Sequence, residues 1–339
     1  MDDRARAVIA PFAVHGGRSD LARERFGGTD WLDLSTGISP WTYPFELPAA
    51  VLARLPSPDD LALLETRAAE CFGSDPAATV AVPGSDVGLR LTGHILARAR
   101  AAVVVPGYGG HRAMWAGEVR PVASTTPELI AAAQDCTAIV LARPGNPGGE
   151  VVPEQVLRAI AVQLAERGGW LIVDEAFADA EPDLSLAGRD WPNLIILRSF
   201  GKFAGLAGLR LGFVIAPPRL VVALRAVLGD WPISGPALAA GRAFYADKDW
   251  QSEQRRRLNQ HGDALGTVLH SAGIAITANT PFFLTCHTGS AWALFEHLGR
   301  RAILTRPFAD DPCRLRVGLA PDESATWRLA EALTEWSRP

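Results

Sequence analysis

Lysine is almost absent from this chain. Lys202 and Lys248 are the only two among 33 lysines and arginines, so nearly every other basic side chain is an arginine. A guanidinium stays protonated in proteins, whereas a lysine amine can lose its proton and form a Schiff base with a carbonyl. Lysine is therefore excluded as the general surface cation of this chain. We interpret Lys202, which follows an apolar run, as a candidate for covalent chemistry; an ordinary surface lysine is the alternative.

Excess positive charge, paired cysteines and a long apolar segment are missing too. A net charge of -4 offers no basic surface for nucleic acid. The four cysteines are widely spaced and lack the cysteine and histidine spacing of a zinc site, so we expect buried thiols and no metal. The charged start, Met1 to Arg4, leads into no apolar stretch of signal-peptide or membrane-span length. We expect no membrane association and a cytoplasmic location.

What the chain does contain is a series of short apolar runs that end in polar residues. Three such runs end shortly before Asn146, at Asp174 and shortly before Lys202. In an open parallel sheet with helices between the strands, the carboxyl ends of the strands line one crevice, and ligands bind there. The pattern therefore predicts an α/β fold that brings these three side chains together.

A reactive lysine beside a strand-terminal aspartate suits pyridoxal phosphate, because a carboxylate keeps the pyridine nitrogen protonated and the ring electron-accepting. The phosphate of that cofactor needs an anion site. Gly84, Ser85 and Asp86 stand between a predicted strand and a predicted helix, and they offer free backbone N–H groups and a hydroxyl. Ser199 and Arg210 could complete the site. Alone, the tripeptide is more often an ordinary helix cap.

The order of the motifs resembles the fold-type I pyridoxal-phosphate enzymes, in the branch of histidinol-phosphate aminotransferase and threonine-phosphate decarboxylase. The resemblance covers nearly the whole chain and implies a large domain with a mostly parallel seven-stranded sheet and a small α/β domain. It rests on Gly84-Ser85-Asp86, Tyr108, Asn146-Pro147, Asp174-Glu175-Ala176, Ser199-x-x-Lys202 and Arg210-Leu211-Gly212.

This resemblance also implies roles for single residues. Lys202 would hold the cofactor as a Schiff base, and Asp174 would pair with the pyridine nitrogen. Asn146 would bond the phenolic oxygen of the ring, and Tyr108 would stack on the ring face. The other cofactor-binding residues would be Gly84, Ser85, Asp86, Ser199 and Arg210.

Three segments are expected from the resemblance and the composition. An N-terminal arm at residues 1–40 would pack on the small domain, residues 41–232 would form the large cofactor-binding domain, and residues 233–339 the small α/β domain. Residues 233–236 are interpreted as the hinge. A homodimer is expected, although Leu55 stands where much of the branch has a tyrosine that reaches the cofactor phosphate of the partner subunit. Whether the partner contributes to this site is therefore open.

The choice within the branch depends on the ends of the chain and on Phe177. The opening His15-Gly16-Gly17, followed by residues 31–40, resembles the start of the threonine-phosphate decarboxylases of the cobalamin pathway. Phe177 stands where the aminotransferases usually carry tyrosine. By the resemblance, Arg316 would bind the substrate carboxylate, with Arg314 a solvated neighbour. The other substrate-binding residues would be Arg306 for the phosphate, helped by His15, Gly16 and Gly17, and Asn146. The alternatives are that Arg306 is an ordinary surface charge and that His15-Gly16-Gly17 forms only a turn.

We therefore predict a pyridoxal-phosphate-dependent enzyme that decarboxylates O-phospho-L-threonine to aminopropanol phosphate in cobalamin biosynthesis. The alternative is an aminotransferase that acts on histidinol phosphate or a similar phosphorylated amine, since Arg316 would serve either reaction. A regulator built on the same fold is a third possibility. Such regulators usually carry a DNA-binding domain, and we expect no spare length for one.

Overall fold

The computed structural model describes residues 3–336, which form two compact units. Within the described residues, the larger unit comprises Thr42–Asn146 and Glu150–Gln254, and the smaller one comprises residues 3–41, Pro147–Gly149 and residues 255–336. Met1 and Asp2, which begin the charged opening of the chain, lie outside the described residues, as do residues 337–339.

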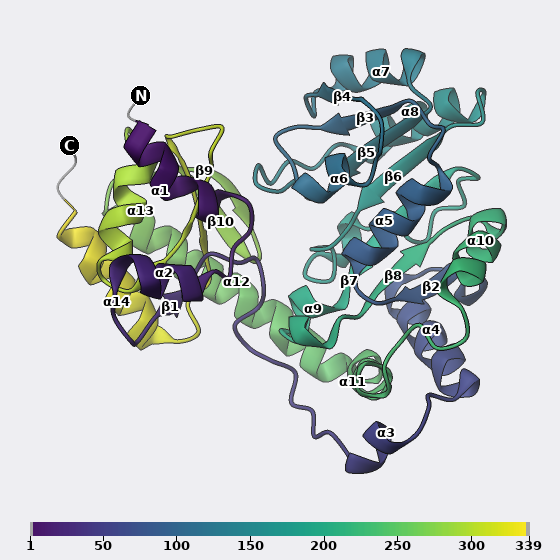
Figure 1. Cartoon of the computed structure of the whole chain (residues 1–339), viewed down its shortest axis with the longest axis horizontal. Helices are drawn as coiled ribbons and strands as arrows, with labels where there is room; N and C mark the ends of the chain where they lie inside the picture. The colour runs from purple at the N-terminus through teal and green to yellow at the C-terminus, as the bar shows by residue number, and fades with distance from the viewer. Residues whose placement is uncertain (1–2, 337–339) are drawn as a thin grey trace. The chain divides into compact units, whose positions relative to one another are not determined.

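A seven-stranded sheet forms the centre of the larger unit as described here (Figure 1). Its strand order is β2-β8-β7-β6-β5-β3-β4, and β8 alone runs antiparallel to its neighbours. The α/β fold with a mostly parallel sheet is thereby confirmed. The strands are β2 (Thr79–Val82), β3 (Ala101–Val104), β4 (Val119–Val122), β5 (Ala138–Ala142), β6 (Trp170–Asp174), β7 (Leu194–Ser199) and β8 (Gly212–Ile215).

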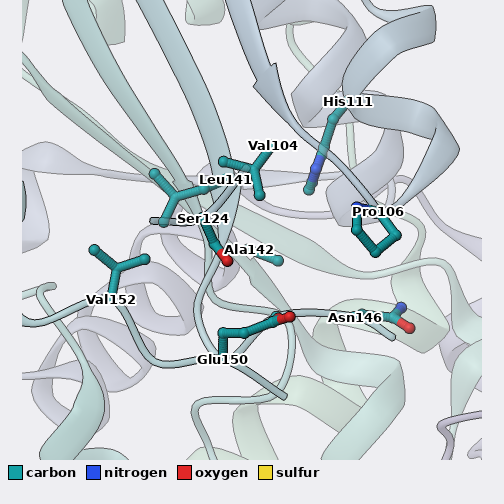
Figure 2. A pocket seen from close by; sticks show the side chains of 11 residues that line it. Val104, Pro106, His111, Ser124, Leu141, Ala142, Asn146, Glu150 and Val152 are labelled. Carbon is teal, nitrogen blue, oxygen red and sulfur yellow. The ribbon is translucent and has the colours of Figure 1, made fainter. Parts of the chain in front are cut away.

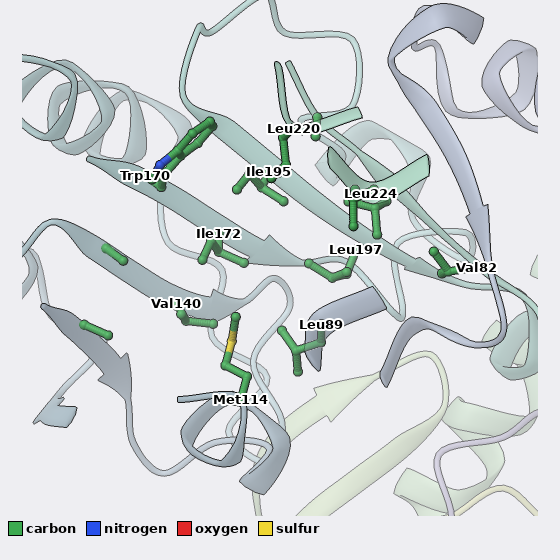
Figure 3. Packing of buried hydrophobic residues seen from close by; sticks show 14 of the residues in the cluster. Val82, Leu89, Met114, Val140, Trp170, Ile172, Ile195, Leu197, Leu220 and Leu224 are labelled. Atoms are coloured by element: carbon green, nitrogen blue, oxygen red, sulfur yellow. The ribbon is translucent and has the colours of Figure 1, made fainter. Parts of the chain in front are cut away.

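The central strands are apolar because both faces of the sheet are covered. Val140, Ile172 and Ile195, from three neighbouring strands, are at most 1% exposed and belong to the hydrophobic cluster drawn in Figure 3. Leu89 from α5 and Leu224 from α10 join the same cluster. A strand buried on both faces cannot carry polar side chains along its length, so its polar residues stand at its ends.

Helices connect the strands of the larger unit. The start of α4 is capped by the Ser57 hydroxyl, which accepts the Asp59 N–H at 3.2 Å, and its end by Gly73, whose φ of 70° suits glycine. The helices are α3 (Ala49–Ala53), α4 (Pro58–Phe72), α5 (Ser85–Ile95), α6 (Gly109–Ala113), α7 (Thr126–Asp135), α8 (Glu154–Ala165), α9 (Phe200–Phe203), α10 (Pro218–Leu228) and α11 (Gly235–Ala246), with single 3₁₀ turns at Pro76–Ala78, Pro182–Leu184 and Ala207–Leu209.

The segment interpreted as a hinge begins a helix. The Ser234 hydroxyl accepts the Ala237 N–H at 3.4 Å, and Pro236 occupies the first turn of α11. Helix α11 packs on α4, so residues 233–254 belong to the larger unit. The division between the units falls at Arg255, inside α12 (Lys248–Ser271), rather than at residue 233 as the sequence suggested.

The smaller unit contains two sheets. Strands β1 (Leu32–Asp33) and β11 (Ile303–Leu304) pair in parallel. The antiparallel sheet has the order β12-β13-β10-β9, formed by β9 (Ala275–Thr280), β10 (Phe283–His287), β12 (Arg306–Pro307) and β13 (Arg314–Gly318). The helices are α1 (Asp3–Ala13), α2 (Ser19–Phe26), α13 (Ala291–Gly299) and α14 (Glu323–Thr334). Phe12 of α1 packs on Phe295 of α13, with ring centres 5.1 Å apart.

No helix within residues 3–336 is long and apolar enough to cross a membrane. The four cysteines are free thiols, of which Cys136 and Cys286 are buried. Burial raises the pKa of the Cys286 thiol to about 12, so this thiol stays protonated at neutral pH.

A buried ion network lies beside the sheet. Arg198 of β7 is 2% exposed and donates to Glu175 at 3.0 Å, to Asp179 and to the Ser185 hydroxyl at 3.1 Å. Its guanidinium also lies 4.3 Å from the centre of the Phe72 ring. Burial alone would lower the pKa of Arg198, but the charges of Asp179 and Glu175 outweigh it and raise the pKa. The two carboxylates therefore depend on one cation.

Replacing that cation tests the network. Arg198→Met keeps much of the side-chain volume but leaves Glu175 and Asp179 without their guanidinium, and we expect it to lower the free energy of unfolding by about 3–5 kcal/mol. The urea midpoint of unfolding measures the loss. Arg120→Met is the matched control, because its pair with Asp135 at 3.1 Å is exposed and should be worth at most about 1 kcal/mol. Equal shifts in both variants would contradict the expectation.

Candidate functional site

The polar residues singled out by the sequence gather at one edge of the large sheet. Strands β5, β6 and β7 are parallel neighbours in register, with Ala142 opposite Asp174 and Asp174 opposite Leu197. Asn146 follows β5, and Lys202 lies in the short helix α9 that follows β7. The structure thus brings the ends of the three runs to the same edge.

Asp174 ends β6 and is held from two sides. Its Oδ1 accepts the Ala176 N–H at 3.1 Å, and its Oδ2 lies 2.9 Å from Nε2 of His111, a side chain that is 1% exposed. This contact is a hydrogen bond from histidine to carboxylate in the tautomer that carries its proton on Nε2. His111 thereby fixes the orientation of the Asp174 carboxylate.

Sequence reasoning missed His111. It lies in α6, and its partner Asp174 is 63 residues away, so no local spacing marks the pair. One signal was present: His111 stands three residues after Tyr108, which places both on one helical turn at the end of β3. The two rings pack edge to face with centres 5.5 Å apart.

A small pocket lies beside His111, the hydrogen-bond partner of Asp174. Figure 2 shows His111 among the side chains that line it, together with Asn146, Ser124 and Glu150. The Nδ1 atom of His111 is buried and has no hydrogen-bond partner among the described residues. Val104, Leu141 and Val152 line the same pocket, so its wall combines polar and apolar side chains.

The start of α5 forms an anion cradle with the loop before β8. Gly84, with φ of 93°, caps α5, and a Cβ there would lie 2.7 Å from Nη2 of Arg210. A Cβ on Gly212 would lie 2.4 Å from the Ser85 nitrogen, so the two segments approach closely because both positions are glycine. Arg210 itself has a left-handed backbone with φ of 54°. Ser199 is paired with Gly212 and stands beside the cradle. A helix start and a guanidinium together suit a phosphate.

Tyr108 is positioned by the same helix. Its hydroxyl donates to Oδ1 of Asp86 at 2.9 Å, and Asp86 also pairs with Arg90 at 3.0 Å. Asp86, which the sequence placed among the cofactor-binding residues, thus contacts Tyr108 in this structure. Burial raises the pKa of Tyr108, and the Asp86 charge adds to the effect.

The candidate lysine has an aromatic neighbour. The Lys202 Nζ lies 6.0 Å from the centre of the Phe177 ring, which is 4% exposed. Phe177 offers no hydroxyl, so its contribution to the surroundings of the amine is apolar.

Two arginines predicted for substrate binding lie opposite each other in the smaller unit. Arg306 of β12 is the register partner of Arg316 in β13. Arg316 is 3% exposed, donates to the Ser35 carbonyl at 2.7 Å and lies over the Phe283 ring. Its pKa is lowered, mainly by burial and next by the charge of Arg306. Two neighbouring guanidinium groups, one of them buried, favour the binding of an anion.

The residues near this pair differ in part from expectation. The Arg306 guanidinium donates to the Val14 carbonyl at 3.2 Å, next to the predicted His15-Gly16-Gly17 segment. The Gly17 N–H donates to the Ser35 hydroxyl at 2.7 Å, so this N–H already has an acceptor within the protein. Gly16 lies so close to the Ser35 carbonyl that a Cβ would stand 2.3 Å from it, and the His15 side chain is exposed.

Arg314 is not the solvated neighbour that the sequence suggested. Its side chain is 15% exposed and pairs with Asp310 at 2.6 Å. It also packs over the Phe308 ring, 4.8 Å from its centre. Arg314 therefore has a carboxylate partner of its own, although Arg306 also packs over the Phe308 ring, 5.1 Å from its centre.

Several known proteins are similar to this chain in sequence or in fold. The family described as aminotransferase class I and II matches residues 49–333. The chain is 39% identical to a threonine-phosphate decarboxylase of Pseudomonas aeruginosa, over 96% of this chain and 98% of that protein. It is 38% identical to a threonine-phosphate decarboxylase of a Sinorhizobium species, over 94% and 97%. Its fold is similar to a histidinol-phosphate aminotransferase of Sinorhizobium meliloti in complex with pyridoxal-5'-phosphate, with a TM-score of 0.81, 23% identity and coverage of 94% and 93%.

The tyrosines allow a test of the packing in the larger unit. The chain has three, and the pKa values of Tyr43, Tyr108 and Tyr245 are all raised, with burial the largest cause in each. A tyrosine whose pKa is higher in the folded than in the unfolded state stabilises the fold at low pH, and this stability is lost as the pH rises above the unfolded value of about 10. We therefore expect the ultraviolet tyrosinate band to be small in the native protein at pH about 10 and to appear when urea unfolds it. Half-ionised tyrosines in the native protein at that pH would contradict this packing.

Proposed function

Because the chain belongs to the aminotransferase class I and II family, we propose that it is a pyridoxal-phosphate-dependent enzyme that decarboxylates O-phospho-L-threonine to aminopropanol phosphate. The observation that carries the choice of substrate is the nearly end-to-end likeness to two proteins named threonine-phosphate decarboxylase. The place of the reaction in cobalamin biosynthesis stays a prediction from the resemblance described above.

The residues at the edge of the large sheet fit the cofactor. When bound, pyridoxal phosphate supplies a protonated ring that draws electrons from the α-carbon of the substrate. Asp174 would pair with the pyridine nitrogen and keep it protonated, and His111 orients the Asp174 carboxylate through the 2.9 Å contact. The glycine at position 84 lets the Arg210 guanidinium reach the start of α5, where a phosphate would bind.

Other residues at the same edge of the sheet supply the remaining cofactor contacts in this proposal. Ser85 and Ser199 bind the phosphate with Arg210, and Gly84 and Asp86 shape the cradle around them. Tyr108, held by its bond to Asp86, stacks on the ring, and Asn146 bonds the phenolic oxygen. The cofactor-binding residues in this proposal are Gly84, Ser85, Asp86, Tyr108, Asn146, Asp174, Ser199, Lys202 and Arg210.

The two arginines of the smaller unit anchor the substrate. Arg316 binds the carboxylate and Arg306 the phosphate, so that two charged contacts fix rotation about the α-carbon and set which bond breaks. With the cofactor bound, the Lys202 amine would be the group that holds it, and the same amine would serve as the acid that supplies a proton to the substrate α-carbon. The apolar Phe177 ring beside Lys202 supports this assignment, because water near the amine would compete for that step.

We also propose a homodimer in the cytoplasm. Leu52 and Leu55, in and just after α3, are 66% and 67% exposed, which suits a surface covered by a second subunit. A leucine at position 55 cannot bond a phosphate, so in this proposal the partner subunit makes no hydrogen bond to the cofactor through that position.

Turnover without a second substrate tests the reaction. The protein with pyridoxal phosphate and O-phospho-L-threonine, and with no keto acid, should release carbon dioxide and aminopropanol phosphate in excess over enzyme, as mass spectrometry would show. Lys202→Ala should yield no product above the uncatalysed level, because it lacks the amine. If no product forms but histidinol phosphate converts the bound cofactor to its amine form, the protein is an aminotransferase instead.

Arg306→Gln tests the phosphate anchor. A hydrogen bond to a charged group is worth about 1.5–3 kcal/mol, so KM for O-phospho-L-threonine should rise about 10- to 100-fold with the affinity for pyridoxal phosphate unchanged. Arg314→Gln is the matched control, because Arg314 already pairs with Asp310. A parallel loss of cofactor affinity, or an equal rise of KM in the control, would remove Arg306 from the substrate site.

A further inference from the structure

A cluster of three different metal-ligand types lies in the smaller unit, apart from the arginine pair. His287 ends β10, and Asp311 and Cys313 precede β13. A histidine nitrogen, a carboxylate oxygen and the Cys313 sulfur all lie within 4.8 Å of one another. We propose that these three side chains bind a divalent metal ion of the zinc class.

The backbone around the cluster is held by hydrogen bonds. The Thr288 N–H donates to the Cys313 carbonyl at 2.9 Å, and the Ala291 N–H donates to the Pro312 carbonyl at 2.9 Å. The Asp311 carboxylate accepts the Cys313 N–H at 2.9 Å through Oδ1. The two chain segments that carry the ligands are therefore fixed to each other before any ion binds, which lowers the entropic cost of binding.

The donor set selects the class of metal. Calcium and magnesium prefer six or more oxygen ligands, whereas one nitrogen, one oxygen and one sulfur suit zinc. Bond lengths of about 2.0–2.3 Å in a tetrahedral site require donor atoms roughly 3.3–3.8 Å apart, so a pair at the 4.8 Å limit has to close by about 1.0–1.5 Å. His287 is exposed and can rotate to do this. A water molecule would fill the fourth position.

The charges of the cluster balance the ion. On binding, the Cys313 thiol loses its proton to solvent as the metal–sulfur bond forms, so that thiolate and carboxylate together match a dication. Arg314 places a positive charge beside the cluster, because its Nε lies 3.6 Å from Oδ2 of Asp311. Asp310 pairs with the same guanidinium at 2.6 Å and offsets that charge.

Binding would fasten the end of β10 to the start of β13. In the sheet, His287 is the register partner of Arg314, and Arg316 follows two residues later in the same strand. A metal ion at the cluster would therefore hold the start of β13, the strand that carries Arg316, against the end of β10. The site itself does not depend on the proposed decarboxylation and stands or falls separately from it.

Metal uptake by the full chain with its cofactor tests the proposal. After treatment with a chelator and removal of free cofactor, the protein is dialysed against Zn²⁺, and bound metal is measured by elemental analysis. We expect one Zn²⁺ per chain, and a loss of affinity of about tenfold or more in each of Cys313→Ser, His287→Ala and Asp311→Asn. Cys71→Ser is the control, because Cys71 is a partly exposed thiol of the larger unit, and it should bind as the unchanged protein does.

Cobalt identifies the ligands directly. Co²⁺ bound by a thiolate in a tetrahedral site gives strong visible bands, which should appear in the unchanged protein and in Cys71→Ser and vanish in Cys313→Ser. Circular dichroism checks that each variant is folded. Uptake of Zn²⁺ that is equal in the unchanged protein and in folded Cys313→Ser, or visible bands that survive that substitution, would overturn the proposal.

Discussion

The parallel pairing of β5, β6 and β7 is the constraint on which the candidate site depends. The three strands are buried on both faces, so the free energy of burying their apolar side chains is available only if polar groups are kept to the strand ends. Since the register aligns those ends, Asp174 and the segments that carry Asn146 and Lys202 meet at one edge. The antiparallel strand β8 then returns beside β7 and brings Gly212 to the start of α5. The position of the candidate site therefore follows from the packing of the apolar side chains of these strands.

Much of this arrangement could be predicted because its signals are local. The apolar runs, the residues at their ends and the Gly84-Ser85 turn can each be recognised within ten residues or so, and the parallel-sheet rule joins them. His111 could not be found in that way, because its role exists only through Asp174, which belongs to another strand. The register pairing of Arg306 with Arg316 in adjacent strands could not be predicted either. Strand β12 is two residues long, too short for any periodicity to predict.

Two further features also depend on contacts between segments that are distant in the sequence. Ser234, Gly235 and Pro236 are turn-forming residues, but serine and proline also start helices, and only the packing of α11 on α4 decides between the two. The cysteines lack zinc-site spacing along the sequence, yet His287 and Cys313 come together because β10 and β13 pair. A search by spacing finds sites built within one segment and overlooks sites built between strands.

The left-handed backbone at Arg210 sets a limit on how this protein can be engineered. A non-glycine residue with φ of 54° is less favourable than glycine by about 1 kcal/mol, so a design procedure that ranks substitutions by conformational energy would choose Arg210→Gly. Such a procedure would rank the variant as more stable, but the variant would lack the guanidinium that reaches the start of α5. At position 210 the backbone energy favours glycine, whereas ligand affinity favours arginine. Libraries designed to raise stability should therefore keep Arg210.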